Sequence, residues 1–147
     1  MGVAAIEEQE IVDCQFPRPF YIHRYPWTLG SYKYMRKTDK NLENTLIGAL
    51  KEVCEAALEE FHGFQWLTHF ANYSYFPGSL TIVCIFDTNE NLSKMYQKYK
   101  GDKFRDMIKS KLKSVDIEVK DIRTHVNFDT EEDCKKENDG KWHERFK

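Results

Sequence analysis

The chain has 147 residues, of which 41% are hydrophobic and 31% charged, and its formal net charge is −2. This length fits a single domain spanning residues 1–147, and this composition excludes a disordered or fibrous chain. An overall pI near 6.2 argues against a protein that coats duplex DNA. No apolar run approaches the roughly 18 residues of a membrane span, and the N-terminus has no signal-peptide pattern, so we expect a cytoplasmic location without membrane contact.

The N-terminal quarter of the chain changes character along its length. Residues 1–13 form an acidic arm, and residues 18–37, "RPFYIHRYPWTLGSYKYMRK", mix aromatic and basic side chains without any acid. Strand-forming residues on either side of "PWTLGS" predict a hairpin, or a single strand with a long kink.

An amphipathic helix is predicted over residues 42–61. Asn41 is the expected N-cap and Gly63 the expected stop. Apolar residues recur at spacings of three and four and form one stripe, which we expect to pack against a sheet. The stripe consists of Leu42, Leu46, Leu50, Val53, Cys54, Ala57, Leu58 and Phe61.

Residues 64–76 and 79–87 are rich in aromatic and β-branched side chains, and Pro77-Gly78 separates them, which predicts an antiparallel hairpin. The second strand is apolar on both faces, so we expect it to be central. Thr88 then caps a second helix, which Gly101 bends or divides.

The last part of the chain alternates and then becomes polar. Residues 115–129 predict a strand with a bulge, or two short strands. A polar tail follows from residue 130 to residue 147.

The resulting order is strand, helix, strand, strand, helix, strand. This order predicts an α+β fold in which two amphipathic helices cover one face of an antiparallel sheet, either ferredoxin-like (βαββαβ) or a close variant.

The aromatic and basic residues of this sheet provide the leading functional hypothesis. Aromatic rings stack on unpaired bases while cations follow the phosphates, so an open sheet face predicts a binding module for single-stranded nucleic acid. Two alternatives remain for the same rings: a homodimer interface through the sheet, or a surface covered by the C-terminal tail. The candidate binding residues are Arg24, Tyr32, Tyr34, Arg36, Trp66 and His69.

An enzymatic alternative is a metal-dependent nuclease. Glu118-x-Lys120 on a strand, joined by Asp87, is a pattern with which nucleases hold a divalent cation and stabilise phosphate charge. The same alternation is typical of a strand with one solvated face, so we favour a protein that is not an enzyme and needs no cofactor.

Two other patterns have weaker functional interpretations. His23, His69 and His125 fall in predicted strands but lack ligand spacing, so we expect no metal site. Lys94, Lys98, Arg105 and Lys109 fall on one face of the second helix, where a solvated charged face is the simpler explanation than contact with phosphate. The four cysteines form no CxxC pair, and we expect free thiols.

Overall fold

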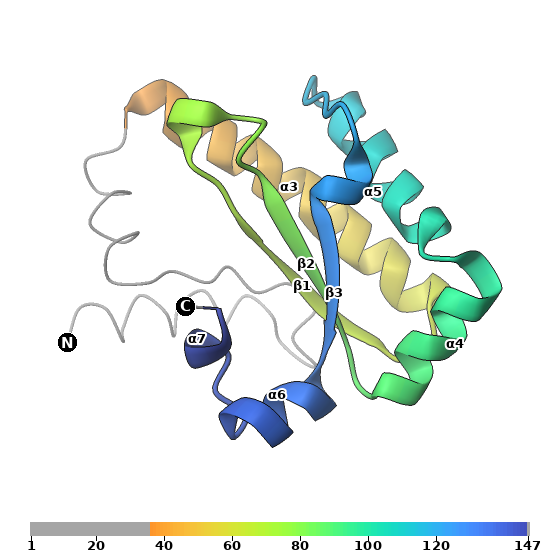
Figure 1. Cartoon of the computed structure of the whole chain (residues 1–147). Coiled ribbons are helices and arrows are strands. Elements are labelled where there is room, and N and C mark those ends of the chain that lie inside the picture. The colour runs from red at the N-terminus through yellow and green to blue at the C-terminus, as the bar shows by residue number, and fades with distance from the viewer. Residues whose placement is uncertain (1–35, 147) are drawn as a thin grey trace.

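The computed structural model describes residues 36–146, and its longest element is helix α3 (Lys37–Glu60) (Figure 1). The predicted hairpin 18–37 therefore lies outside the described residues, except that Arg36 precedes the helix and Lys37 begins it. The helix starts at Lys37, five residues before the predicted first residue Leu42, and its N-cap is Arg36 instead of Asn41. Most of the predicted stripe is buried, but Leu58 is 36% exposed, so its assignment to the core was wrong.

The predicted antiparallel hairpin is confirmed, but its first strand ends at Phe70 instead of Phe76 and its second begins at Thr81. Strand β1 (Phe64–Phe70) pairs antiparallel with β2 (Thr81–Phe86), and the connection contains the short 3-10 helix η1 (Tyr73–Tyr75). The second strand is central, as predicted, because the sheet of the described residues has the order β1-β2-β3. Five of the six β2 residues are buried, which agrees with an apolar strand covered on both faces.

The second helix is divided at Gly101, as the sequence predicted. Helix α4 (Asn89–Tyr99) begins at Thr88, whose hydroxyl accepts a hydrogen bond from the Asn91 backbone, and α5 (Asp102–Ser114) follows. Lys100 and Gly101 both have positive φ, at 56° and 76°, and this pair of left-handed residues separates the two helices.

The prediction of an antiparallel, ferredoxin-like sheet is wrong. Strand β3 (Val126–Thr130) runs parallel to β2, so the sheet is mixed and the described order is α-β-β-α-α-β-α. The predicted strand at 115–121 is also absent. That segment turns back on the end of α5, where the Ile117 backbone N–H bonds the Leu112 carbonyl, and η2 (Ile122–Thr124) leads into β3. Its alternation instead reflects the burial of Ile117 and Val119 in the core.

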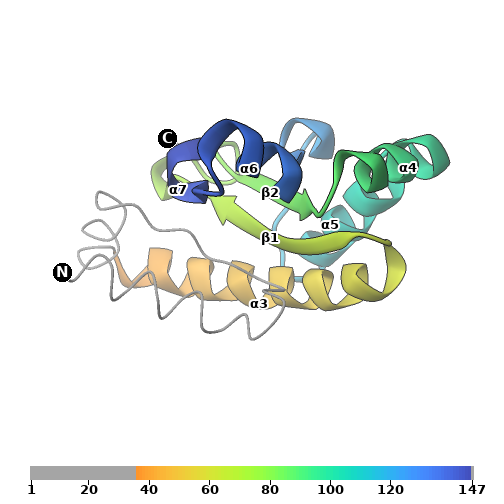
Figure 2. The same cartoon turned by 90° about the horizontal axis from the view of Figure 1, so that it is seen from below.

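Helices cover both faces of the sheet. Helix α3 lies below the sheet in Figure 2, and α5 packs against α3. Helices α6 (Glu131–Asn138) and α7 (Trp142–Arg145) lie on the opposite face, so the polar tail is helical and covers part of the sheet. Among residues 36–146, no helix has the length and apolar composition needed to cross a membrane.

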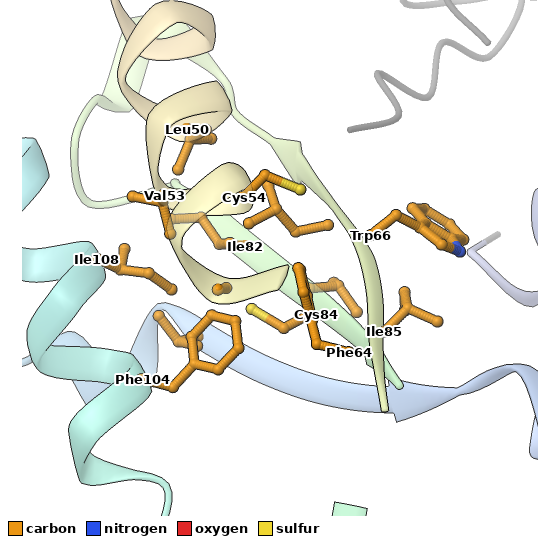
Figure 3. Close-up of a cluster of buried hydrophobic side chains, with 14 of the residues drawn as sticks. Leu50, Val53, Cys54, Phe64, Trp66, Ile82, Cys84, Ile85, Phe104 and Ile108 are labelled. Carbon is orange, nitrogen blue, oxygen red and sulfur yellow. The ribbon is translucent and has the colours of Figure 1, made fainter. Parts of the chain in front are cut away.

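The core lies between β1, β2, α3 and α5 (Figure 3). Phe104 of α5 stacks on Phe61 at 4.6 Å between ring centroids and meets Phe64 edge to face at 5.2 Å. Cys54 and Cys84 are buried free thiols there, as predicted, and burial raises the pKa of Cys84 well above its usual value.

Candidate functional site

The structure places three of the six predicted binding residues. Arg36 is exposed, and its guanidinium lies 3.2 Å from the Asp39 carboxylate. Trp66 and His69 are only 3% and 4% exposed, so neither ring offers a face to solvent. Arg24, Tyr32 and Tyr34 lie outside the described residues, and their binding role stays a prediction.

Trp66 is covered by the C-terminal tail. Its indole N–H donates to Oε1 of Glu131 at 3.0 Å, and the Trp142 indole N–H donates to the same oxygen at 2.8 Å. The two rings meet edge to face with centroids 5.1 Å apart. For this ring, covering by the tail is therefore the alternative that the described contacts favour.

His69 belongs to a buried polar cluster that joins β1 to α3. Its Nε2 lies 2.9 Å from Oε1 of Glu43, a residue that is only 6% exposed. The Tyr73 hydroxyl donates to the same oxygen at 2.5 Å. Oε1 of Glu43 thus contacts both the Tyr73 hydroxyl and the His69 imidazole. This cluster ties the hairpin connection to the second turn of α3.

The end of the molecule that contains this connection also carries exposed aromatic and basic groups. Tyr75, in η1, is 73% exposed, the largest exposure among the large apolar and aromatic side chains of the described residues. Arg36 and Lys37 are exposed at the start of α3, at the same end (Figure 1). We call Arg36, Lys37 and Tyr75 the hairpin-tip surface.

The proposed nuclease residues do not come together. Asp87 follows β2, where its Oδ1 accepts from the Thr88 backbone N–H at 2.6 Å and from the Asn91 amide at 2.9 Å. Glu118 and Lys120 are exposed in the segment before β3, whose first residue pairs with the start of β2. The acids therefore lie at opposite ends of the sheet, and no metal-binding cluster of acids, histidines and cysteines occurs within residues 36–146.

The described histidines of the three-histidine hypothesis serve separate contacts. His125 is buried, and its Nδ1 lies 2.6 Å from the Leu80 carbonyl oxygen, whereas His69 faces Glu43. His23 lies outside the described residues.

The basic helix face is divided between α4, which carries Lys94 and Lys98, and α5, which carries Arg105 and Lys109. Cations on and beside this face pair with acids. Lys103 pairs with Glu60, and Lys111 lies 3.0 Å from Glu52, so α5 is tied to the acidic side of α3. On α4, Lys94 lies 3.5 Å from Glu90. These contacts are those of a solvated charged surface, where ion pairs contribute little to stability.

Sequence reasoning missed a repeated motif at the ends of the parallel strands. Phe86-Asp87-Thr88 and Phe128-Asp129-Thr130 each end a strand and begin a helix. In both copies the aspartate Oδ1 accepts from the following backbone N–H, and the threonine hydroxyl caps the helix. The signal was the repetition of Phe-Asp-Thr, followed two positions later by glutamate.

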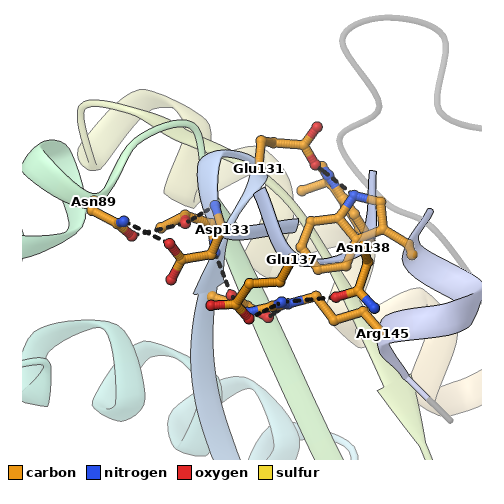
Figure 4. A network of polar contacts seen from close by, with 10 residues as sticks. Asn89, Glu131, Asp133, Glu137, Asn138 and Arg145 are labelled. Atoms are coloured by element: carbon orange, nitrogen blue, oxygen red, sulfur yellow. Dashed lines mark hydrogen bonds and ion pairs between the residues drawn. The ribbon is translucent and has the colours of Figure 1, made fainter. Parts of the chain in front are cut away.

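Figure 4 shows how this strand-end region is bonded internally. Asn89 accepts from the Thr130 hydroxyl at 2.9 Å, and its amide donates to Asp133 at 2.7 Å. Arg145 holds both Asp129 oxygens, at 2.5 and 3.0 Å, and these hydrogen bonds raise the pKa of Arg145. The carboxyl ends of parallel strands often bind ligands, but here these groups join α4, α6 and α7.

Comparison of the chain with protein families, with curated proteins and with solved structures finds no match.

Proposed function

We propose that this chain is a binding module for single-stranded nucleic acid and that the hairpin-tip surface makes the contact. The observation that carries this proposal is the presence of a 73% exposed tyrosine ring, Tyr75, at the same end of the molecule as Arg36 and Lys37. Single-strand binding needs these two groups, a ring for the base and cations for the phosphates.

Local electrostatics support a polyanion at this surface. Cations near a helix N-terminus are unfavourably placed relative to the helix dipole. Arg36 precedes α3 and Lys37 begins it, and Asp39, which pairs with Arg36, is the acid of the first turn. A phosphate near these side chains would relieve that repulsion. The sequence just before them, Tyr32-Lys33-Tyr34, continues the same aromatic and basic pattern.

The test is a fluorescence anisotropy titration of the full chain with a short fluorescein-labelled oligo(dT), with a duplex of equal length as competitor. We expect preference for the single strand. Tyr75→Ala should weaken binding by roughly 1–3 kcal/mol at every salt concentration. Arg36→Ala and Lys37→Ala should each reduce the salt slope by about 0.7.

Lys98→Ala is the matched control, because Lys98 is an exposed cation on α4, at the opposite end of the sheet. It should leave the affinity unchanged. Absence of single-strand binding at low salt would refute the proposal. A dimer in sedimentation experiments that dissociates on Tyr75→Ala would instead assign the exposed ring to self-association.

A further inference from the structure

The buried carboxylate of Glu43 lies between the hairpin connection and α3. It accepts the Tyr73 hydroxyl at 2.5 Å and faces His69 Nε2 at 2.9 Å. A buried carboxylate is costly unless hydrogen bonds satisfy it, and such groups are retained in some proteins because they specify one conformation. The conformation at stake here is that of the hairpin connection.

The connection between β1 and β2 is closed on itself by Ser79, whose hydroxyl bonds the Asn72 backbone and whose backbone N–H donates to the Tyr75 carbonyl. These bonds hold the connection together but do not attach it to α3. The regular structure of the connection is the single turn Tyr73–Tyr75, which begins at Asn72, where the side chain accepts from the Ser74 backbone at 3.0 Å. A 3-10 turn this short has little stability of its own. The Tyr73 ring also stacks on Phe76, with centroids 5.2 Å apart. The bond from Tyr73 to Glu43 therefore fixes this turn relative to α3.

Fixing Tyr73 also determines where Tyr75 points. Successive residues of a 3-10 helix are separated by about 120°, so side chains two positions apart leave the turn in different directions. With the Tyr73 hydroxyl drawn inward to Glu43, the Tyr75 side chain projects into solvent, as its 73% exposure shows.

We infer that Glu43 is a positioning residue of the hairpin-tip surface: by holding Tyr73, it fixes the orientation in which Tyr75 stacks on a base. This inference rests on the proposed function, because it explains what holds the binding ring in place. It adds a role for a residue that lies buried beneath the surface.

The test is a double-mutant cycle with the same labelled oligo(dT). Tyr73→Phe removes the hydroxyl and keeps the ring that stacks on Phe76, so the core of the connection should remain intact. We expect roughly fivefold weaker binding, the equivalent of one net hydrogen bond. In a Tyr75→Ala background, Tyr73→Phe should have no further effect, because the ring that it positions is gone.

Two further measurements separate positioning from general stabilisation. Amide exchange in Tyr73→Phe should accelerate at residues 73–75 and stay unchanged in β2. Glu43→Gln, which keeps an acceptor oxygen, should retain more affinity than Glu43→Ala.

Equal weakening by Tyr73→Phe in both backgrounds, or unchanged exchange at 73–75, would overturn the inference while leaving the proposed function intact. If the wild-type chain binds no single strand, the proposed function fails and the inference fails with it.

Discussion

Leu50→Ala tests the packing of α3 against the sheet most directly. Leu50 has no exposed surface, and it belongs to the main hydrophobic core. The substitution removes three carbon groups, worth roughly 2.4 kcal/mol at about 0.8 kcal/mol each. A residual cavity between the helix and the sheet adds to this loss, so we expect the free energy of unfolding to fall by about 2–5 kcal/mol.

Urea denaturation followed by circular dichroism measures this change. Leu58→Ala is the matched control, because it makes the same chemical change in the same helix at a side chain that is 36% exposed. We expect it to cost about 1 kcal/mol or less. Equal losses for the two variants, or a loss below about 1 kcal/mol for Leu50→Ala, would refute the assignment of the buried face.

Three further predictions concern the strand-end region and the tail. Glu131→Ala leaves two largely buried indole N–H groups without their acceptor. In urea melts it should lower the free energy of unfolding by roughly 1–3 kcal/mol more than Glu131→Gln, which keeps an acceptor oxygen. Equal losses for the two variants would contradict this prediction. Thr88→Ala removes a helix cap and should lower the free energy of unfolding by about 1 kcal/mol in the same melts. Thr130→Ala should lower it more, because Thr130 caps its helix and also donates to Asn89. The reverse order would contradict the bonding described. Desolvation raises the pKa of Cys134 to about 11, so its reaction with iodoacetamide at pH 8 should be much slower in the folded than in the unfolded chain.

The sign of the pH effect at Cys134 follows from the same shift. The folded state holds the thiol proton more tightly than the unfolded state, whose thiol has its ordinary pKa near 9. The stabilisation is therefore complete below about pH 9 and is lost as the pH rises toward about 11. The measurement compares the free energy of unfolding of the wild-type chain with that of Cys134→Ala between about pH 9 and pH 11. If the difference between the two does not change with pH, the raised pKa is contradicted.

The sequence by itself determined the local elements of the described region. The apolar spacing around Leu50, the Pro77-Gly78 pair, the Thr88 cap and the break at Gly101 are signals within a few residues. Each predicted the type of element that forms there, though not every boundary of it. Such elements depend on the preferences and periodicity of neighbouring residues, which a sequence displays directly.

Only the tertiary structure decided how these elements are arranged. The alternation of residues 115–129 is the same whether a strand runs parallel, runs antiparallel or has no partner, so it could not show that β3 is parallel to β2 and starts at Val126. It also could not show that Asp87 and Glu118 lie at opposite ends of the sheet.

The candidate site divides in the same way. Composition identified aromatic rings and cations, including Arg36, but a ring's accessibility depends on which distant segment covers it. Trp66 is buried by Trp142, which lies 76 positions away in the sequence. Tyr75 is exposed in a turn whose Tyr73 hydroxyl donates to Glu43, 30 positions earlier. Burial is decided by contacts between residues far apart in the chain, and periodicity within one element does not contain that information.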